Sequence, residues 1–194
     1  TQVWSGYSQV QSPVINISAK SGADIQSAIT IQEPVFPYNQ YQQYFNMTLD
    51  NAKFTGTLNT PTGVTMNLTL SNGASMQGFK FTGDNGYQNT LKLNVNASSN
   101  ALLKGNWNGG NKVIFNLDSG ADFQGNATNT AGDTTFTLTN GAKISGSVNF
   151  SRGTNTINAS GGSIISGNIT NSGGTNTISL DNSNMSGALN ISNN

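Results

Sequence analysis

The feature of this sequence that most limits its fold is a short unit, about 21 residues long, that returns along the chain. From residue 54 onward, an apolar residue is followed two places later by glycine and usually, two places after that, by a second apolar residue. The glycines of this unit are Gly56, Gly78, Gly105, Gly125, Gly146, Gly167 and Gly187, and their positions differ by 22, 27, 20, 21, 21 and 20. A unit this short cannot bury a core alone, so successive units must pack on one another.

Each unit also contains a short run in which every second residue is apolar. Four of these runs end at the same point of successive units, at Leu117, Leu138, Ala159 and Leu180. Alternation with a period of two is typical of β-strands, because successive side chains point to opposite faces. The runs are separated by dipeptides such as Asn72-Gly73 and Asn140-Gly141, which tolerate the positive φ that tight corners require.

Short strands that recur without an intervening helical pattern favour a coil in which each strand pairs with its counterpart in the next turn. We therefore predict an all-β chain folded as a parallel β-helix, a solenoid with about 21 residues per turn. The β-helix repeats cover residues 49–194. Residues 1–48 lack the period, and we interpret them as irregular N-terminal coils or a cap over the end of the rod. The aromatic stretch at 36–45 could stack on sugars, although a capping role is favoured.

Two irregularities refine this alignment. In the unit of Gly78, Lys80 takes the place of the second apolar residue. The longest interval, between Gly78 and Gly105, contains an insertion around 83–87, which we expect to leave the coil as a surface loop. Tyr87 is a candidate binding residue in that loop, and a tolerated insertion without a role is the favoured alternative.

The composition excludes several classes of partner and site. The eight basic and eight acidic residues give a net charge of zero, so no basic footprint for nucleic acid is present. Charged residues are 8% of the chain, and about thirty asparagines, with serine and threonine, keep the surface polar instead. This composition, together with the lack of cysteine, favours an exported bacterial protein.

The sequence contains few residues of the types that catalysis or metal binding requires. Cysteine and histidine are absent, which removes the commonest metal ligands and general bases. Asp118 and Asp122 are the only acidic residues close in sequence, and alignment on the glycines places Asp122 beneath Lys143, as a structural charge pair on neighbouring strands. We predict no catalytic residue, no metal site, no cofactor and no enzymatic activity.

Outward polar ladders are the best candidates for a binding surface. The residues three places after each glycine are Asn59, Asn108, Thr128, Asn149, Thr170 and Asn190. The segment Thr-Asn-Thr at 154–156 recurs at 175–177, which adds Asn155 and Asn176 to the candidates. Stacked Asn and Thr also stabilise a coil by themselves, and this structural role is favoured. The alternative is adhesion to the same array on a neighbouring cell, or to glycans.

Two of the repeats carry a resemblance to a known family. The segments Ile144-Ser-Gly-Ser-Val-Asn-Phe-Ser-Arg-Gly-Thr-Asn-Thr-Ile157 and Ile165-Ser-Gly-Asn-Ile-Thr-Asn-Ser-Gly-Gly-Thr-Asn-Thr-Ile178 resemble passenger domains of autotransporter adhesins of Gram-negative bacteria. The resemblance implies a right-handed β-helix on the bacterial cell surface that acts in attachment, autoaggregation, biofilm formation or virulence. It also implies a host receptor or glycan, or the same protein on a neighbouring cell, as partner. The family's outer-membrane barrel is absent from this chain, which looks like part of a longer passenger.

Three further functions stay open at this point. A vacuolating-type toxin passenger would form oligomers that act on membranes. A polysaccharide-binding or polysaccharide-degrading β-helix is a second alternative, of which degradation would need a groove with paired carboxylates that this sequence does not supply. An ice-binding solenoid is disfavoured because regular Thr-x-Thr rows do not persist through all the turns.

Overall fold

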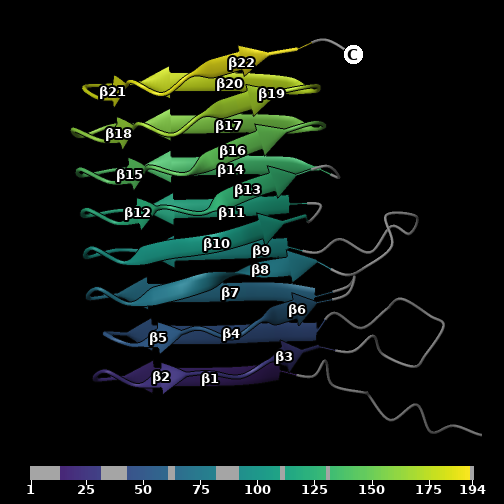
Figure 1. The fold of residues 1–194 in the computed structure, drawn as a ribbon, viewed down its shortest axis with the longest axis vertical. Helices are drawn as coiled ribbons and strands as arrows, with labels where there is room; N and C mark the ends of the chain where they lie inside the picture. Colours follow the sequence, from purple (N-terminus) through teal and green to yellow (C-terminus); the bar gives the residue numbers. More distant parts are fainter. Residues whose placement is uncertain are drawn as a thin grey trace, which may run out of the picture.

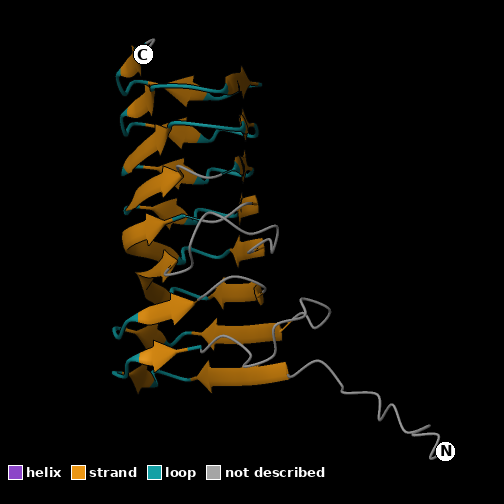
Figure 2. Cartoon of the chain, turned by 90° about the vertical axis from the view of Figure 1, so that its right-hand side faces the viewer, coloured by secondary structure: helices purple, strands orange, loops and turns teal. Residues whose placement is uncertain are grey.

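A computed structural model describes residues 14–31, 43–60, 64–81, 92–109, 112–129 and 132–192. Within these ranges the chain consists of β-strands joined by short corners, with no helix. Figure 1 shows the successive turns stacked into a rod, with the first turn at one end and the last at the other. Figure 2 shows the same stack after a rotation of 90°.

The first sheet contains eight strands, one from each successive turn. In spatial order they are β1 (Val14–Lys20), β4 (Gln43–Asp50), β7 (Val64–Ser71), β9 (Lys92–Ala97), β11 (Lys112–Leu117), β14 (Asp133–Leu138), β17 (Thr154–Ala159) and β20 (Thr175–Leu180). Every neighbouring pair is parallel.

The second sheet contains fourteen strands in two parallel runs that meet at a bend. The run before the bend consists of β2 (Asp24–Ile25), β5 (Lys53–Phe54), β12 (Asp122–Phe123), β15 (Lys143–Ile144), β18 (Ile164–Ile165) and β21 (Asn184–Met185). The run after it consists of β3 (Ile29–Thr30), β6 (Leu58–Thr60), β13 (Asn126–Asn129), β16 (Ser147–Phe150), β19 (Ile169–Asn171) and β22 (Leu189–Ile191). The longer strands β8 (Ser75–Phe81) and β10 (Leu102–Asn108) pass through both runs.

The strand register confirms the predicted parallel β-helix. Leu117 pairs with Leu138, Leu138 pairs with Ala159, and Ala159 pairs with Leu180. Each step advances the chain by roughly 21 residues, as the repeat predicts. Leu117, Leu138 and Ala159 are buried, because the alternation directs them all to the same side of the sheet.

The coil begins earlier in the chain than the repeat predicts. Strand β1 pairs with β4 over seven residues, from Val14 with Tyr44 to Lys20 with Asp50. The regular pairing therefore crosses the expected boundary at residue 48. The repeat is hard to see here because Asn16 and its partner Asn46 lie 30 residues apart, with residues 32–42 outside the described part of the chain.

Most corners that follow the first sheet use two successive residues in the left-handed region, whereas the corners at Asn51 and Asn182 use one. At one such corner Asn140 has a φ of 52° and Gly141 a φ of 76°. The backbone N–H of Ala142 then donates to the carbonyl oxygen of Thr139 at 3.1 Å, which closes a tight turn. Asparagine and glycine adopt this conformation at low cost, which explains the Asn-Gly dipeptides of the repeat.

The repeat glycines at the bend of the second sheet are required for a different reason. The turns touch there, and a Cβ on Gly146 would lie 1.8 Å from the carbonyl oxygen of Gly125. A Cβ on Gly167 would lie 1.6 Å from the carbonyl oxygen of Gly146. None of these three glycines has a positive φ. The absence of a side chain, and not conformational freedom, is what the position needs.

Gly78 does not align with the other repeat glycines. A register shift in β10 pairs Gly78 with Asn106, so that Phe79 pairs with Trp107 and Lys80 with Asn108. Phe79 is buried and Lys80 is exposed. The prediction that Lys80 fills the second apolar place is therefore wrong, because β10 carries one residue more than β8 between the paired positions.

The interior of the rod is a continuous apolar core with an aromatic cluster at its centre. Phe115 and Phe136 stack in adjacent turns with ring centroids 4.4 Å apart. Trp107 and Phe123 pack edge-on or tilted against this pair. The indole N–H of Trp107 donates to the carbonyl oxygen of Lys104 at 2.9 Å, so the buried ring leaves no polar atom unsatisfied.

Candidate functional site

The second sheet presents a straight column of outward residues, which we call the polar stripe. From one end of the rod to the other it consists of Thr30, Asn59, Lys80, Asn108, Thr128, Asn149, Thr170 and Asn190. Each residue pairs with the next across neighbouring strands. The six positions expected from the sequence all fall in this column, and the structure adds Thr30 and Lys80 to it.

The side chains of the polar stripe are accessible and not engaged with their neighbours. Asn108 and Asn190 are exposed, whereas Thr128, Asn149 and Thr170 are half-buried. No hydrogen bond joins any of these five side chains to another residue of the described chain. Each hydroxyl or amide therefore keeps its donor and acceptor capacity for water or for a partner.

The outer face of the first sheet differs, because its asparagines bond to one another along the rod. The amide of Asn46 donates to Asn16 at 2.8 Å, that of Asn67 to Asn46 at 2.8 Å, and that of Asn94 to Asn67 at 2.9 Å. In the adjacent column Asn116 donates to Asn96 at 2.9 Å. These amides use part of their bonding capacity to join turns, which matches the structural role of stacked asparagine.

Asn155 and Asn176 do not belong to an outward surface. The side chain of Asn155 is fully buried, with its amide nitrogen donating to the carbonyl oxygen of Arg152 and to the side chain of Asn176, both at 2.9 Å. Its side-chain oxygen accepts the backbone N–H of Thr134 at 3.0 Å. The expected outward position of these two asparagines is wrong because they are the middle residues of Thr-Asn-Thr segments whose threonines face outward.

The aromatic candidates divide between the described and the undescribed parts of the chain. Tyr87, and the aromatic residues between 36 and 41, lie outside the described residues. Of the two that are described, Tyr44 is exposed on the first sheet and Phe45 is buried in the core. Phe45 belongs to β4, which has a paired strand on each side, so the capping role expected for this stretch stays a prediction.

Aspartate side chains form clamps between turns. Asp122 and Lys143 pair in register as expected. The two carboxylate oxygens of Asp122 accept hydrogen bonds from the hydroxyl of Ser145 at 2.7 Å and from the amide of Gln124 at 3.0 Å. Asp24 repeats this arrangement with Thr55 and Gln26 in an earlier turn. Both carboxylates thus fasten one turn to the next.

Asp118 forms a similar clamp at a corner. Its carboxylate accepts the hydroxyl of Thr139 and the amide of Asn140, both at 2.7 Å, and the hydroxyl of Ser119 at 2.8 Å. These bonds, led by that from Thr139, hold the pKa of Asp118 below its usual value. The carboxylate stays ionised as a structural acceptor.

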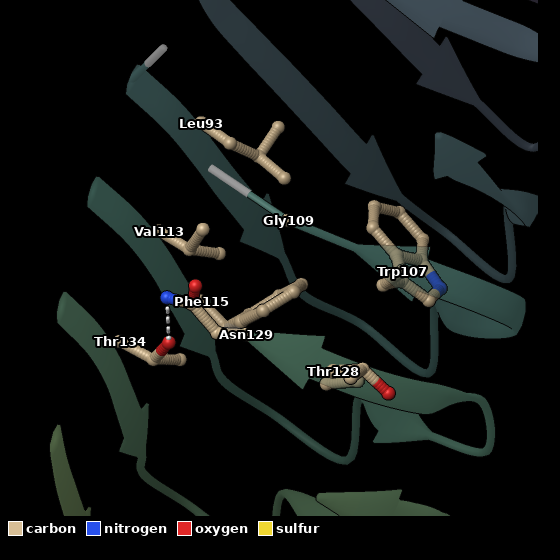
Figure 3. A pocket seen from close by; sticks show the side chains of 9 residues that line it. Leu93, Trp107, Gly109, Val113, Phe115, Thr128, Asn129 and Thr134 are labelled. Atoms are coloured by element: carbon tan, nitrogen blue, oxygen red, sulfur yellow. Dashed lines mark hydrogen bonds between the residues drawn. The ribbon is translucent and has the colours of Figure 1, made fainter. Parts of the chain in front are cut away.

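A small hollow lies inside the rod near the aromatic cluster (Figure 3). Its lining is mostly apolar and consists of Leu93, Trp107, Gly109, Val113, Phe115, Ala127, Thr128, Asn129 and Thr134. The amide of Asn129 donates to the hydroxyl of Thr134 at 2.7 Å at its edge. The cavity measures about 10 Å³. This volume is at the lower limit for one water molecule, so it has no room for a substrate or cofactor.

Other kinds of site have no candidate within the described ranges. No group of three or more Asp or Glu side chains there could hold a metal ion. No helix long and apolar enough to cross a membrane occurs in those ranges either. The polar stripe is therefore the candidate site.

Comparisons with known proteins do not place the chain in a family. No family model matches it, and no curated protein or solved structure shows significant similarity to it. The functional argument accordingly depends on the fold and on the chemistry of the polar stripe.

Proposed function

We propose that this chain is part of a bacterial cell-surface adhesin, of the autotransporter passenger type, that attaches cells through the polar stripe. The observation that carries the proposal is the contrast between the polar stripe and the other outward columns, which include Asn106 and Asn126 of the second sheet, joined by a hydrogen bond of 3.3 Å. Asparagines of the first sheet bond to one another, whereas the side chains of the polar stripe have no partner among the described residues.

The chemistry of the stripe suits adhesion between neutral surfaces. Asn and Thr each offer both a donor and an acceptor, so the same side chain can meet a glycan hydroxyl or another Asn or Thr. Seven of the eight stripe residues are uncharged. Two such surfaces can approach without strong repulsion, and removing water from them costs less than removing it from charged groups.

The rod also gives the stripe the rigidity that binding favours. Its residues stand on paired strands, with inward neighbours packed in the core. Little conformational entropy of the backbone is lost when a partner binds such a surface. We propose binding without turnover, at the cell surface, with either a host receptor or glycan or the same protein on a neighbouring cell as the partner.

Aggregation of beads coated with the purified chain tests this function. We expect parent beads to clump and beads carrying Asn149→Lys with Thr170→Lys to clump less, because the added charges repel and desolvate poorly. The matched control is Asn158→Lys with Ser179→Lys, which adds the same charge at exposed positions of the first sheet. Beads that do not clump and do not bind cells or glycans would contradict the proposal. Equal clumping by the stripe variant and the parent would exclude the stripe.

A further inference from the structure

Three Asn-Gly dipeptides of the described chain contain the groups needed for spontaneous deamidation. Glycine has no Cβ, so its backbone nitrogen can closely approach the side-chain carbonyl carbon of the asparagine before it. Attack at that carbon releases ammonia, and asparagine is for this reason one of the chemically labile residues. A fourth dipeptide, at 85–86, lies outside the described residues. The three described dipeptides are Asn72-Gly73, Asn108-Gly109 and Asn140-Gly141.

The glycine nitrogens of the three dipeptides have the same hydrogen-bonding pattern. The N–H groups of Gly73, Gly109 and Gly141 each donate to a carbonyl oxygen of the next turn, at 2.9, 2.9 and 3.0 Å. The nitrogen can react only while this bond is open, so local opening is needed at all three positions. All three asparagines are exposed to water. The differences between the dipeptides lie in the surroundings of the asparagine.

At Asn72 and Asn140, a carboxylate holds the side-chain amide. The amide nitrogen of Asn72 donates to Asp50 at 2.6 Å, and that of Asn140 donates to Asp118 at 2.7 Å. Both asparagines also have a positive φ, in tight turns closed by a backbone hydrogen bond. These bonds restrain the rotation that the reaction needs. The adjacent carboxylate also disfavours the attack, because negative charge develops on the amide as the new bond forms.

At Asn108, the neighbouring charge is positive. Asn108 is the last residue of β10, and its side chain has no hydrogen bond within the described chain. It pairs in register with Lys80 of β8, which is also exposed. Paired strands lie about 4.8 Å apart, so the ammonium group can approach the amide of Asn108. An ammonium group at this place stabilises the negative charge that develops during the attack.

We propose that Asn108 is a deamidation site of the folded chain and that the ammonium group of Lys80 promotes the reaction. The backbone nitrogen of Gly109 bonds to the side-chain carbonyl carbon of Asn108. The bond from that carbon to the amide nitrogen then breaks, and ammonia leaves with the proton of the glycine nitrogen. Water opens the resulting succinimide ring at either of its carbonyl carbons, which gives aspartate or isoaspartate.

The product changes the charge of the polar stripe. Lys80 is the only charged residue of the stripe, and the new carboxylate at position 108 lies on the strand beside it. The positive charge is then balanced by an adjacent negative charge, which favours the product. This modification does not depend on the proposed adhesive function, because it needs only water and the residues of the two paired strands.

Peptide mapping after timed incubation at mildly alkaline pH tests the site. The purified chain is kept folded or in concentrated urea, and mass spectrometry follows the replacement of each amide by a carboxylate. In urea we expect similar rates at the three dipeptides, because their neighbours are removed. In the folded chain we expect Asn108 to react about ten times faster than Asn72 and Asn140, since opposite nearby charges act on them. A rate at Asn72 or Asn140 equal to that at Asn108, or an Asn108 that stays intact long after completion in urea, would overturn the proposal.

The variant Lys80→Gln isolates the effect of the charge. Loss of the ammonium group should slow the reaction of Asn108 about threefold in the folded chain and should have no effect in urea. The matched control Lys53→Gln removes the same charge from an exposed position of β5 and should leave the rate at Asn108 unchanged. The role of Lys80 is refuted if the parent and Lys80→Gln react equally fast, or if both variants slow the reaction equally. Far-ultraviolet circular dichroism of each variant checks that the fold is unchanged.

Discussion

At the scale of single residues, the repeat is held by positions where only one side chain is possible. The bend glycines are the clearest case, because neighbouring turns approach within contact distance of their α-carbons. The corner glycines are constrained by conformation instead, and a Cβ on Gly141 would meet nothing within 4 Å. The sequence repeats both kinds of glycine, but only the structure separates their roles.

Replacing Gly146 and Gly141 by alanine should reveal this difference. Gly146→Ala forces a Cβ into the carbonyl of Gly125, and we expect a loss of about 3 kcal/mol or more in the free energy of unfolding. Gly141→Ala costs only the strain of a positive φ, about 1 kcal/mol. Urea denaturation of the two variants measures both values. A smaller loss for Gly146→Ala than for Gly141→Ala would contradict the close contact at the bend.

At the scale of the elements, the sequence predicts the strands well because alternation and burial agree along most of the chain. It fails where polar residues face inward. Asn155 faces the interior, where its side-chain amide is hydrogen-bonded. In the sequence, such a polar residue cannot be distinguished from one that faces outward. It also fails where β10 carries an extra residue, which shifts Gly78 and brings Lys80 into the stripe. The stripe itself was predictable from the fixed offset after each glycine, but its freedom from hydrogen bonds was not.

The corner clamp of Asp118 should make stability depend on acidity. Its pKa in the folded chain lies below the ordinary value of 3.8, mainly because Thr139 donates to it. Its stabilising contribution is therefore complete at neutral pH and is lost as the pH falls below about 4, through the folded-state pKa. We expect Asp118→Asn to lower the melting temperature at pH 7 and to reduce the further drop on acidification. The control Asp181→Asn, at an exposed corner whose carboxylate has no described hydrogen bond, should change neither value.

At the scale of the whole molecule, the stability of each turn depends on the turns packed on either side of it. Residues of the middle turns are enclosed on both sides, whereas Leu180, Leu189 and Ile191 in the last turn remain 44%, 49% and 68% exposed. In stacked arrays each unit contacts only its neighbours, so a unit with one neighbour is held less strongly.

Hydrogen exchange should follow this gradient. We expect the amides of β20 and β22 to exchange faster than those of β14 and β16, because opening the last turn breaks contacts on one side only. Mass spectrometry of peptides after timed exchange measures the rates. Uniform protection from the middle turns to the last would show that the rod opens as a single unit.

The corners described above also divide the rod into two edges with different tolerance of chain length. The corner that leaves the first sheet is short in every turn, as at Thr139 to Ala142. On the other side, the number of residues between the described strands varies, with 32–42 in one turn, 82–91 in another and only 110–111 in a third, while the strands before and after these segments keep their pairing. Evolution or protein engineering can therefore add sequence along one edge without disturbing the stacked columns. An epitope or reporter inserted there would leave the register of the paired strands unchanged.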